Sequence, residues 1–435
     1  MNKTFKKVAL LAVAALPLGF VSCGDGDSDG PAPTTSVVTN DELDYVAQTY
    51  VNDVVYPTYK ELAENAAKLR TACSNLYYKV KDGTVGQTDV DAACEAFKDT
   101  RRQWERSEAF LYGAATDNNI DPHIDSWPLD QQQMKEALTN ESVISGMIDG
   151  WGRYVYVQNK NFDSTMGFHG LEFVLFRDGK NRPAADFLDK DDYEGFTTVD
   201  GLSEAAFAKA VSEDIDNMLN LLEYGWNADA DKKLALQTNC QWVLTGTKND
   251  GLSSLGIGYG PLLLNATKSN GYFSTWQETL ENILVAGCSK ICQEVYTQKL
   301  GQAYRVATGH GGTTEDGEKE SIDYIESPYS QRSFIDYRDN IYSIQNSLYG
   351  TRDIDAEPKA NSLMTIMSKY NYANYNSLKT ALENAKSALD IAVNSGIPFV
   401  KDPANDQVKN AIAAIKTLDE ELNTAGNWFR YLKTK

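Results

Sequence analysis

The stretch DELDYVAQTYVNDVVYPTYKELAENAAKLRTACSNLYYKV, residues 41–80, indicates the fold class of this chain. Its apolar side chains recur every three or four residues, the spacing that places them on one face of a helix. They are Leu43, Val46, Tyr50, Val54, Leu62, Ala66, Leu69, Cys73 and Leu76. Asn40 is the expected N-cap. Pro57 is expected to kink or break the helix near Tyr56, because proline lacks an N–H and crowds the preceding turn.

The same helical spacing continues along the chain and predicts an all-α protein. A second helix is expected from about Val90 to Tyr112, where Gly113 stops it. Further helices are expected at 130–148, 167–177, 204–226, 230–248, 274–301, 331–349, 360–370, 374–394 and 405–432. Gly251–Gly260 and Thr308–Glu320 are glycine-rich and predict loops.

A polar hinge at Asn227–Lys232 predicts two helical-bundle domains, residues 38–228 and 229–435. An internal repeat is indicated when Phe97–Gly113 is aligned with Phe334–Gly350. The identical pairs are Phe97/Phe334, Asp99/Asp336, Arg101/Arg338, Leu111/Leu348, Tyr112/Tyr349 and Gly113/Gly350. Composition alone can produce such agreement between two helices, so duplication and chance both stay open. If the bundles arose by duplication, their junction is the natural place for a ligand.

The N-terminus predicts export. Three lysines precede an apolar run from Val8 to Phe20, which is too short to span a bilayer and is typical of a signal peptide, residues 1–22. Phe20-Val21-Ser22-Cys23 resembles the lipobox of bacterial lipoproteins, which implies a lipid on Cys23. Residues 23–37 are rich in Gly, Asp, Ser and Pro and predict a flexible tether. We therefore expect an outer-membrane lipoprotein of the cell envelope, held at the membrane only by its lipid.

Charge and composition restrict the function. Lys and Arg number 41 against 61 Asp and Glu, which gives a formal net charge of −20. Such a chain repels nucleic acid and suits a cationic partner. The histidines are only His123, His169 and His310, so a metal site must rely on carboxylates.

Five cysteines remain besides Cys23: Cys73, Cys94, Cys240, Cys288 and Cys292. Their odd number argues against a complete disulfide framework. Cys73 and Cys94 could meet across a helical hairpin, and Cys288 and Cys292 share a helix face. Buried free thiols are the favoured interpretation.

The segment GFHGLEF, residues 167–173, is the sharpest local motif. On a helix His169 and Glu172 lie on one face and could chelate a cation, although a His–Glu hydrogen bond is the alternative. The chain has no His-Glu-x-x-His, and Phe173 stands where an inverzincin needs its second histidine. Further ligands must come from elsewhere.

Glu108 and Asp125 are the candidates for those further ligands. Glu108 is close to apolar side chains in the sequence, and Asp125 lies at an expected turn. Alternatively, Glu108 is a solvated acid on the surface of a helix, and Asp125 only stabilises the turn. His123 and His310 are expected at the surface.

Several motifs together resemble the imelysin family, also called the M75 peptidases. They are Gly167-x-His169-x-x-Glu172, Trp104–Phe110 (WERSEAF), Asp125–Pro128 (DSWP), Glu326–Ser330 (ESPYS), Asp336, Asn340 and Tyr349-Gly350. The resemblance implies two all-α bundles from an ancient duplication, export with frequent lipid anchoring, and a link to iron uptake or regulation and to proteolysis.

Carried onto this sequence, the resemblance makes His169 and Glu172 the metal or catalytic pair. Glu108 is a further catalytic candidate, and Glu108 and Asp125 are further metal ligands. The pocket neighbours are Trp104, Ser107, Trp127, Tyr329, Ser330 and Asp336.

Two functions remain open. The first is a cell-surface protein that binds a metal ion (iron, zinc or calcium), as a monomer, with a small ligand, a peptide or envelope proteins as further partners. The alternative is a metallopeptidase in which Glu172 or Glu108 serves as general base, which needs three ligands and an open position on the metal. Glycan binding is not favoured, because an aromatic fraction of 11% is no enrichment.

Overall fold

The computed structural model describes residues 37–162, 165–189, 193–314 and 317–435. The predicted signal peptide, Cys23 and the tether up to residue 36 lie outside the described residues. None of the helices in the described ranges is both long and apolar enough to cross a membrane.

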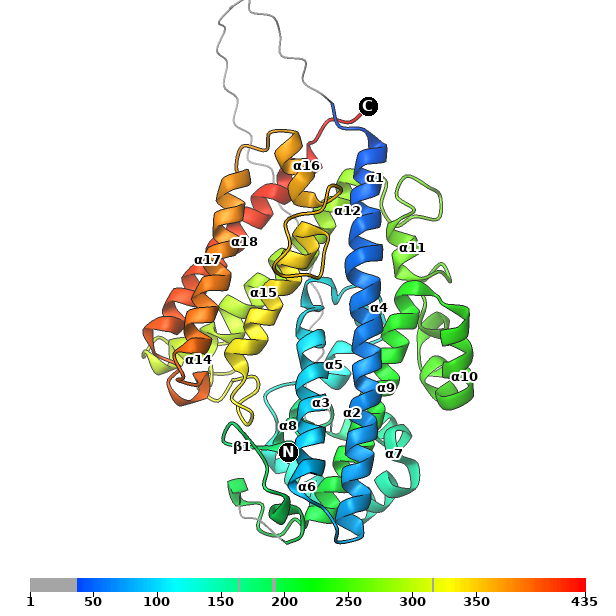
Figure 1. Ribbon diagram of the computed structural model, residues 1–435, viewed down its shortest axis with the longest axis vertical. Coiled ribbons are helices and arrows are strands. Elements are labelled where there is room, and N and C mark those ends of the chain that lie inside the picture. The colour runs from blue at the N-terminus through cyan, green and yellow to red at the C-terminus, as the bar shows by residue number, and fades with distance from the viewer. Residues whose placement is uncertain (1–36, 163–164, 190–192, 315–316) are drawn as a thin grey trace, which may run out of the picture. The chain divides into compact units, whose positions relative to one another are not determined.

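Helices dominate the described part of the chain (Figure 1). Apart from isolated bridges, β-structure in these ranges is one short antiparallel hairpin, β1 (Phe176–Arg177) and β2 (Lys180–Asn181). The prediction of an all-α protein is confirmed.

The stretch 41–80 forms a helical path without interruption. α1 (Asn40–Thr49) passes into the π-helix η1 (Tyr50–Val55) and then into α2 (Tyr56–Lys81). The predicted break at Pro57 is therefore wrong: the proline stands in the first turn of α2, after wider π-helical turns. The N-cap is also one residue earlier than predicted, because the side chain of Thr39 accepts the Glu42 N–H.

The core of the first half is centred on α9 (Gly201–Asn227). α2 and α7 (Glu141–Phe162) pack along it. Most of α9 is buried, and small side chains let its neighbours approach closely, among them Ala205, Ala206, Ala208 and Ala210. A helix that is buried on nearly every side belongs in a protein core.

The other helical segments are connected mostly by short turns. They are α3 (Gln87–Glu105), η2 (Glu108–Phe110), α4 (Ala114–Asp117), α5 (Asp121–Ile124), α6 (Gln131–Thr139), α8 (Phe168–Leu175), η3 (Ala184–Phe187), η4 (Tyr193–Gly195), α10 (Ala230–Thr245), η5 (Lys248–Gly251), α11 (Tyr259–Leu263), α12 (Trp276–Asn282), η6 (Ile283–Ser289), α13 (Lys290–Glu294), η7 (Val295–Lys299), α14 (Gly301–Ala307), α15 (Ser333–Tyr349), α16 (Leu363–Lys369), α17 (Tyr375–Asn394), η8 (Phe399–Lys401) and α18 (Asp406–Arg430).

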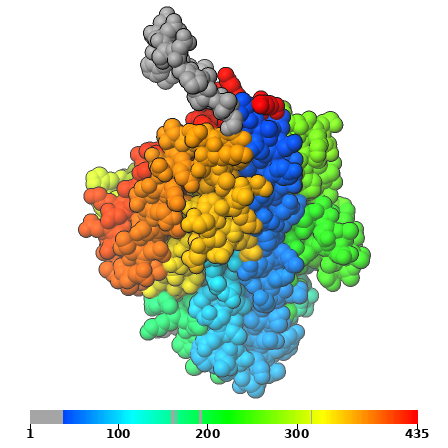
Figure 2. Space-filling view, turned by 45° about the horizontal axis from the view of Figure 1, so that its top comes forward, coloured from blue at the N-terminus to red at the C-terminus, as the bar shows by residue number. Residues whose placement is uncertain are grey.

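The two halves of the sequence pack against each other. In the second half, α17 and α18 pair, and α12, η6 and α13 pack on α18. α15 contacts both α17 and α3, and α1 contacts α12. Figure 2 shows the blue N-terminal helices directly beside the orange segment that contains α16, where Lys369 pairs with Glu42 at 2.5 Å.

The predicted domain boundary coincides with the end of α9. α9 ends at Asn227, and Ala228 is left-handed with a φ of 54°. Because helices from both sides pack together, Val37–Lys435 forms one compact unit by its contacts. The division into bundles 38–228 and 229–435 and their duplication stay predictions.

Three predicted helices differ from the structure. The helix expected from Val90 to Tyr112 ends at Glu105 in α3, and a turn and the 3₁₀ helix η2 follow it. The helix expected at 130–148 is α6 followed by α7, which continues to Phe162 through a kink at Trp151 (φ 43°, ψ −128°). The helix expected at 274–301 alternates between α-helical and π-helical segments from α12 to η7. Apolar spacing indicates a helix in each of these places, but it does not distinguish helical types.

The cysteine interpretation is confirmed. Cys73, Cys94, Cys240, Cys288 and Cys292 are all buried free thiols. Burial raises the pKa of each of them, to about 12 for Cys73 and Cys288.

We expect Leu69→Ala on α2 to lower the free energy of unfolding by about 2–5 kcal/mol, because Leu69 is fully buried and its loss leaves a cavity. Leu234→Ala on α10 is the matched control, since that leucine is 62% exposed and should cost about 0.5 kcal/mol or less. Denaturant titration measures both, and equal losses would contradict the assigned core.

Candidate metal centre

One glycine sets the position of α8, which carries His169 and Glu172. Gly167 has a φ of +97°, which favours glycine, and a Cβ there would lie 2.2 Å from the carbonyl oxygen of Ile124. This close approach brings the start of α8 against the residue before Asp125. All of α8 is buried, so His169 and Glu172 face the interior.

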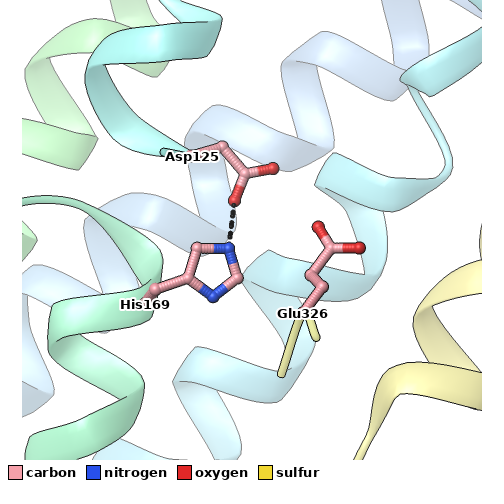
Figure 3. Close-up of side chains that lie close together, drawn as sticks. All are labelled: Asp125, His169 and Glu326. Atoms are coloured by element: carbon pink, nitrogen blue, oxygen red, sulfur yellow. Dashed lines mark ion pairs between the residues drawn. The ribbon is translucent and has the colours of Figure 1, made fainter. Parts of the chain in front are cut away.

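The imidazole of His169 lies between two carboxylates. Its Nε2 is 3.0 Å from Asp125 Oδ1 (dashed in Figure 3), and its Nδ1 is 3.7 Å from Glu172 Oε2. Burial lowers the pKa of His169, but the adjacent carboxylates of Asp125 and Glu172 outweigh burial and raise this pKa to about 9. At neutral pH both ring nitrogens are therefore protonated.

Glu172 is oriented by Ser330. The backbone N–H and the hydroxyl of Ser330 donate to Glu172 Oε1 at 2.7 and 2.6 Å. The other oxygen faces His169 and accepts no hydrogen bond from the described residues. This geometry suits a group that positions His169, while a direct metal bond from Glu172 stays a prediction.

Arg101 on α3 joins the acids that surround it. Its Nη2 lies 2.6 Å from Glu105 Oε1 and 2.5 Å from Glu326 Oε1, and its Nη1 pairs with Asp125. Asp336 lies 3.8 Å from its Nε. Burial lowers the pKa of Arg101, but these carboxylates outweigh burial and raise it further above its ordinary value.

Lys299, the last residue of η7, is the second buried cation. Its Nζ lies within 4.0 Å of carboxylate oxygens from Glu105, Glu108, Glu294 and Glu326. Its side chain is only 1% exposed. Lys299 therefore compensates Glu108 and Glu294, which do not pair with Arg101, and shares Glu105 and Glu326 with Arg101.

We call this group the acidic cluster. Its carboxyl groups outnumber its basic groups, Arg101, His169 and Lys299. The carboxyl groups are those of Glu105, Glu108, Asp121, Asp125, Glu172, Glu294, Glu326 and Asp336.

Burial and neighbouring charges determine how these acids titrate. Burial raises the pKa of Asp121 to about 7 and that of Asp336 to about 6. The pKa values of Glu105 and Glu108 are also raised well above their usual range, mainly by burial. Asp125 is the exception: burial raises its pKa, but Arg101 and His169 outweigh burial and hold it well below its usual range.

Two sets of donor atoms converge in the acidic cluster. Asp125, His169 and Glu326 each offer one atom, and these atoms lie within 4.8 Å of one another; Glu105, Glu108 and Asp125 form a second such set. Figure 3 shows the first set facing one another from separate backbone segments. An imidazole with carboxylates suits iron or zinc, once His169 has lost its second proton.

The structure brings most of the predicted pocket residues to this centre. Trp104 donates its indole N–H to Asp125 Oδ2 at 2.6 Å, and Asp336 accepts the hydroxyl of Ser327 at 2.5 Å. Ser107 lies behind them, donating to the carbonyl of Trp104.

Trp127 and Tyr329 lie at the edge of the centre. The ring of Trp127 packs against that of Tyr324 with centroids 4.3 Å apart and the ring planes tilted by 48°. Tyr329 packs edge-on against Phe173, and its hydroxyl accepts from Gln131. Neither side chain belongs to the two donor sets.

The two remaining histidines lie away from the donor sets. His310 is exposed, as predicted. The surface position predicted for His123 is wrong: it is 6% exposed, and its Nε2 is 2.6 Å from Asp214 Oδ2 on α9. Asp121 and Pro122 make the local sequence look solvated, but α5 turns His123 inward.

The sequence analysis did not assign Arg101, Glu105, Lys299 and Glu326 to the site, although Glu105 and Glu326 lie in the motifs WERSEAF and ESPYS. Arg101, Glu105 and Glu108 follow one another at spacings of four and three, which indicates one helix face. This signal could have found Glu105. Nothing local marks Lys299.

Comparison with known proteins shows related folds. The chain is 28% identical over 166 residues to iron-regulated protein A of Synechococcus elongatus, a match that spans 38% of this chain and 37% of that relative. The crystal structure of an iron-regulated protein A precursor from Parabacteroides distasonis aligns with a TM-score of 0.70 at 24% identity, covering 92% of this chain and 98% of that one.

An imelysin-like protein from Psychrobacter arcticum aligns with a TM-score of 0.50 at 12% identity, over 91% of this chain and 95% of that one. At these identities the solved structures establish the fold alone. The family model described as Imelysin matches residues 55–425, so the chain belongs to the imelysin family.

Proposed function

We propose that this protein binds a metal cation in the acidic cluster, and that iron is the first candidate. The observation that carries the proposal is the set of three buried donors, Asp125, His169 and Glu326, within 4.8 Å of one another. A relative and a structural neighbour carry names that link them to iron regulation.

The charge balance of the cluster supports a cation. The carboxyl groups outnumber Arg101, Lys299 and His169, and burial raises the pKa of several of them, among them Asp121 and Glu108, which favours their protonated forms. A metal cation would replace protons rather than add to an already neutral site. The net charge of −20 raises the local concentration of cations around the molecule.

We place the protein in the cell envelope, as a monomeric outer-membrane lipoprotein. The basic and apolar start of the chain and the lipobox-like Phe20–Cys23 support export and a lipid on Cys23. The lipid would be its only hold on the membrane. A small ligand, a peptide or envelope proteins are its further proposed partners.

The electrostatics of the centre weigh against a peptidase. Such an enzyme needs an ionised carboxylate as general base beside the metal. Burial holds the pKa of Glu108 well above its usual range, which disfavours the ionised form that a general base needs. Glu172 is engaged by Ser330 and His169.

His169→Ala should weaken iron(II) or zinc binding by about 100-fold, because one of three donors is lost. Isothermal titration of the purified chain measures this loss. His310→Ala, which removes an exposed histidine, should bind like the wild type. Affinity weaker than about 100 μM for every metal in the wild type, roughly −5.5 kcal/mol, would refute the proposal.

Metal affinity should rise about tenfold for each pH unit between about 6.5 and 9. The folded-state pKa of His169 is about 9, so the metal must displace a proton throughout this window and competes better as pH rises. The slope should decrease by about one proton in His169→Ala and stay unchanged in His310→Ala. Titrations at several pH values measure it, and equal slopes in wild type and His169→Ala would contradict it.

We expect no metal-dependent cleavage of an unfolded polypeptide by the purified protein, because burial disfavours the ionised form of Glu108 and Glu172 is engaged by Ser330 and His169. The measurement is gel analysis with and without a chelator, for wild type and Glu108→Gln. Cleavage that a chelator stops, and that Glu108→Gln abolishes, would establish the peptidase instead.

A further inference from the structure

The ammonium of Lys299 lies where a cation would bind. Its Nζ is 3.1 and 3.3 Å from the two carboxylate oxygens of Glu326, 3.5 Å from Glu108 Oε1, 3.9 Å from Glu294 Oε1 and 4.0 Å from Glu105 Oε2. An ammonium needs at most three acceptors. Oxygens from four carboxyl groups around one point are instead typical of the environment of a hard metal ion.

The surroundings of Lys299 overlap the second donor set. Glu105 and Glu108 each offer an oxygen within 4.8 Å of the other and of Asp125. Glu105 and Glu326 are fully buried, and each keeps one carboxylate oxygen, Glu105 Oε1 and Glu326 Oε2, that accepts no hydrogen bond from the described residues. These oxygens make only ion pairs, with Arg101 and with Lys299. Glu105 Oε1 stays paired with Arg101 at 2.6 Å, whereas Glu326 Oε2, which pairs with Lys299 at 3.1 Å, is left for a metal ion once the ammonium is removed.

We infer that Lys299 is a tethered occupant of a second cation position. Its ammonium fills a site for a hard divalent cation made by Glu105, Glu108, Glu294 and Glu326, and it thereby keeps cations from solution out of that position. This inference goes beyond the proposed function and does not depend on a metal at His169.

Lys299 excludes free cations from this position because its ammonium competes with them as part of the same chain. The ammonium is always present at its site, whereas a free cation must first expel it from the carboxylates of Glu105, Glu108, Glu294 and Glu326. A buried ammonium without partners is strongly disfavoured. The ammonium brings a single positive charge to four carboxyl groups, of which only Glu105 and Glu326 also pair with Arg101. A divalent cation would supply the additional charge.

Lys299→Met tests the inference, because methionine has similar volume and no charge. Calcium is the probe, since it takes six to eight oxygens in flexible geometry. Equilibrium dialysis should find one additional Ca²⁺ per chain in Lys299→Met compared with wild type, with a dissociation constant of about 100 μM or tighter. Lys299→Arg and Lys290→Met, which removes an exposed lysine nearby, should gain none.

The experiment tests the inference whether or not Lys299→Met folds without added metal. If Lys299→Met is folded and binds no additional Ca²⁺, the inference is wrong. If it unfolds in chelator, circular dichroism should show refolding when Ca²⁺ is added; a chain still unfolded at about 10 mM Ca²⁺ also overturns it. Adding Glu108→Gln to Lys299→Met should abolish the gain.

The same measurement in a His169→Ala background separates this inference from the proposed function. An additional Ca²⁺ in Lys299→Met/His169→Ala supports the tethered-cation role, even where the wild type binds no iron or zinc. Loss of the gain in that background would show that the added cation uses His169, and would overturn the second position.

Discussion

The ion pairs of the buried Arg101 are the interaction on which the arrangement of the centre depends. This one guanidinium contacts Glu105 on its own helix, Asp125 after α5, Glu326 in the loop before α15, and Asp336 within α15. Removing one partner from such a buried network costs about 3–5 kcal/mol, because a charge is left unpaired. The partners come from distant parts of the sequence, so charge compensation, as well as apolar packing, joins the two halves of the chain.

The loop before α15 contains two residues with an unusual backbone conformation. Ser327 and Gln331 have φ values of 55° and 56°, a conformation that side chains rarely adopt. Between them lies Ser330, which orients Glu172, and just before them lies Glu326. Strained backbone of this kind persists where the surroundings fix it, and here it places two groups of the centre at once.

Features that depend on residues close together in the sequence could be predicted from it, whereas features that depend on residues far apart could not. Helical periodicity identified the helices, and the spacing of His169 and Glu172 identified the motif, because both signals are local. Pro57 was misjudged because adjacent π-helical turns accommodate it, and His123 because its partner Asp214 is on α9. The sequence around Arg101 and Lys299 does not indicate their role, because most of the acids that pair with them come from other elements of the fold. The fold class was thus predictable, whereas the charge balance of the centre was not.

The five buried thiols have a consequence for how the protein meets oxidants. A cysteine reacts as a thiolate, and the raised pKa of Cys73, Cys240 and Cys288 keeps the thiolate scarce at neutral pH. Burial also denies access to a second thiol or to a disulfide-exchange catalyst. Sulfur chemistry is therefore confined to the interval before folding, and the mature fold keeps its shape under oxidising and reducing conditions alike.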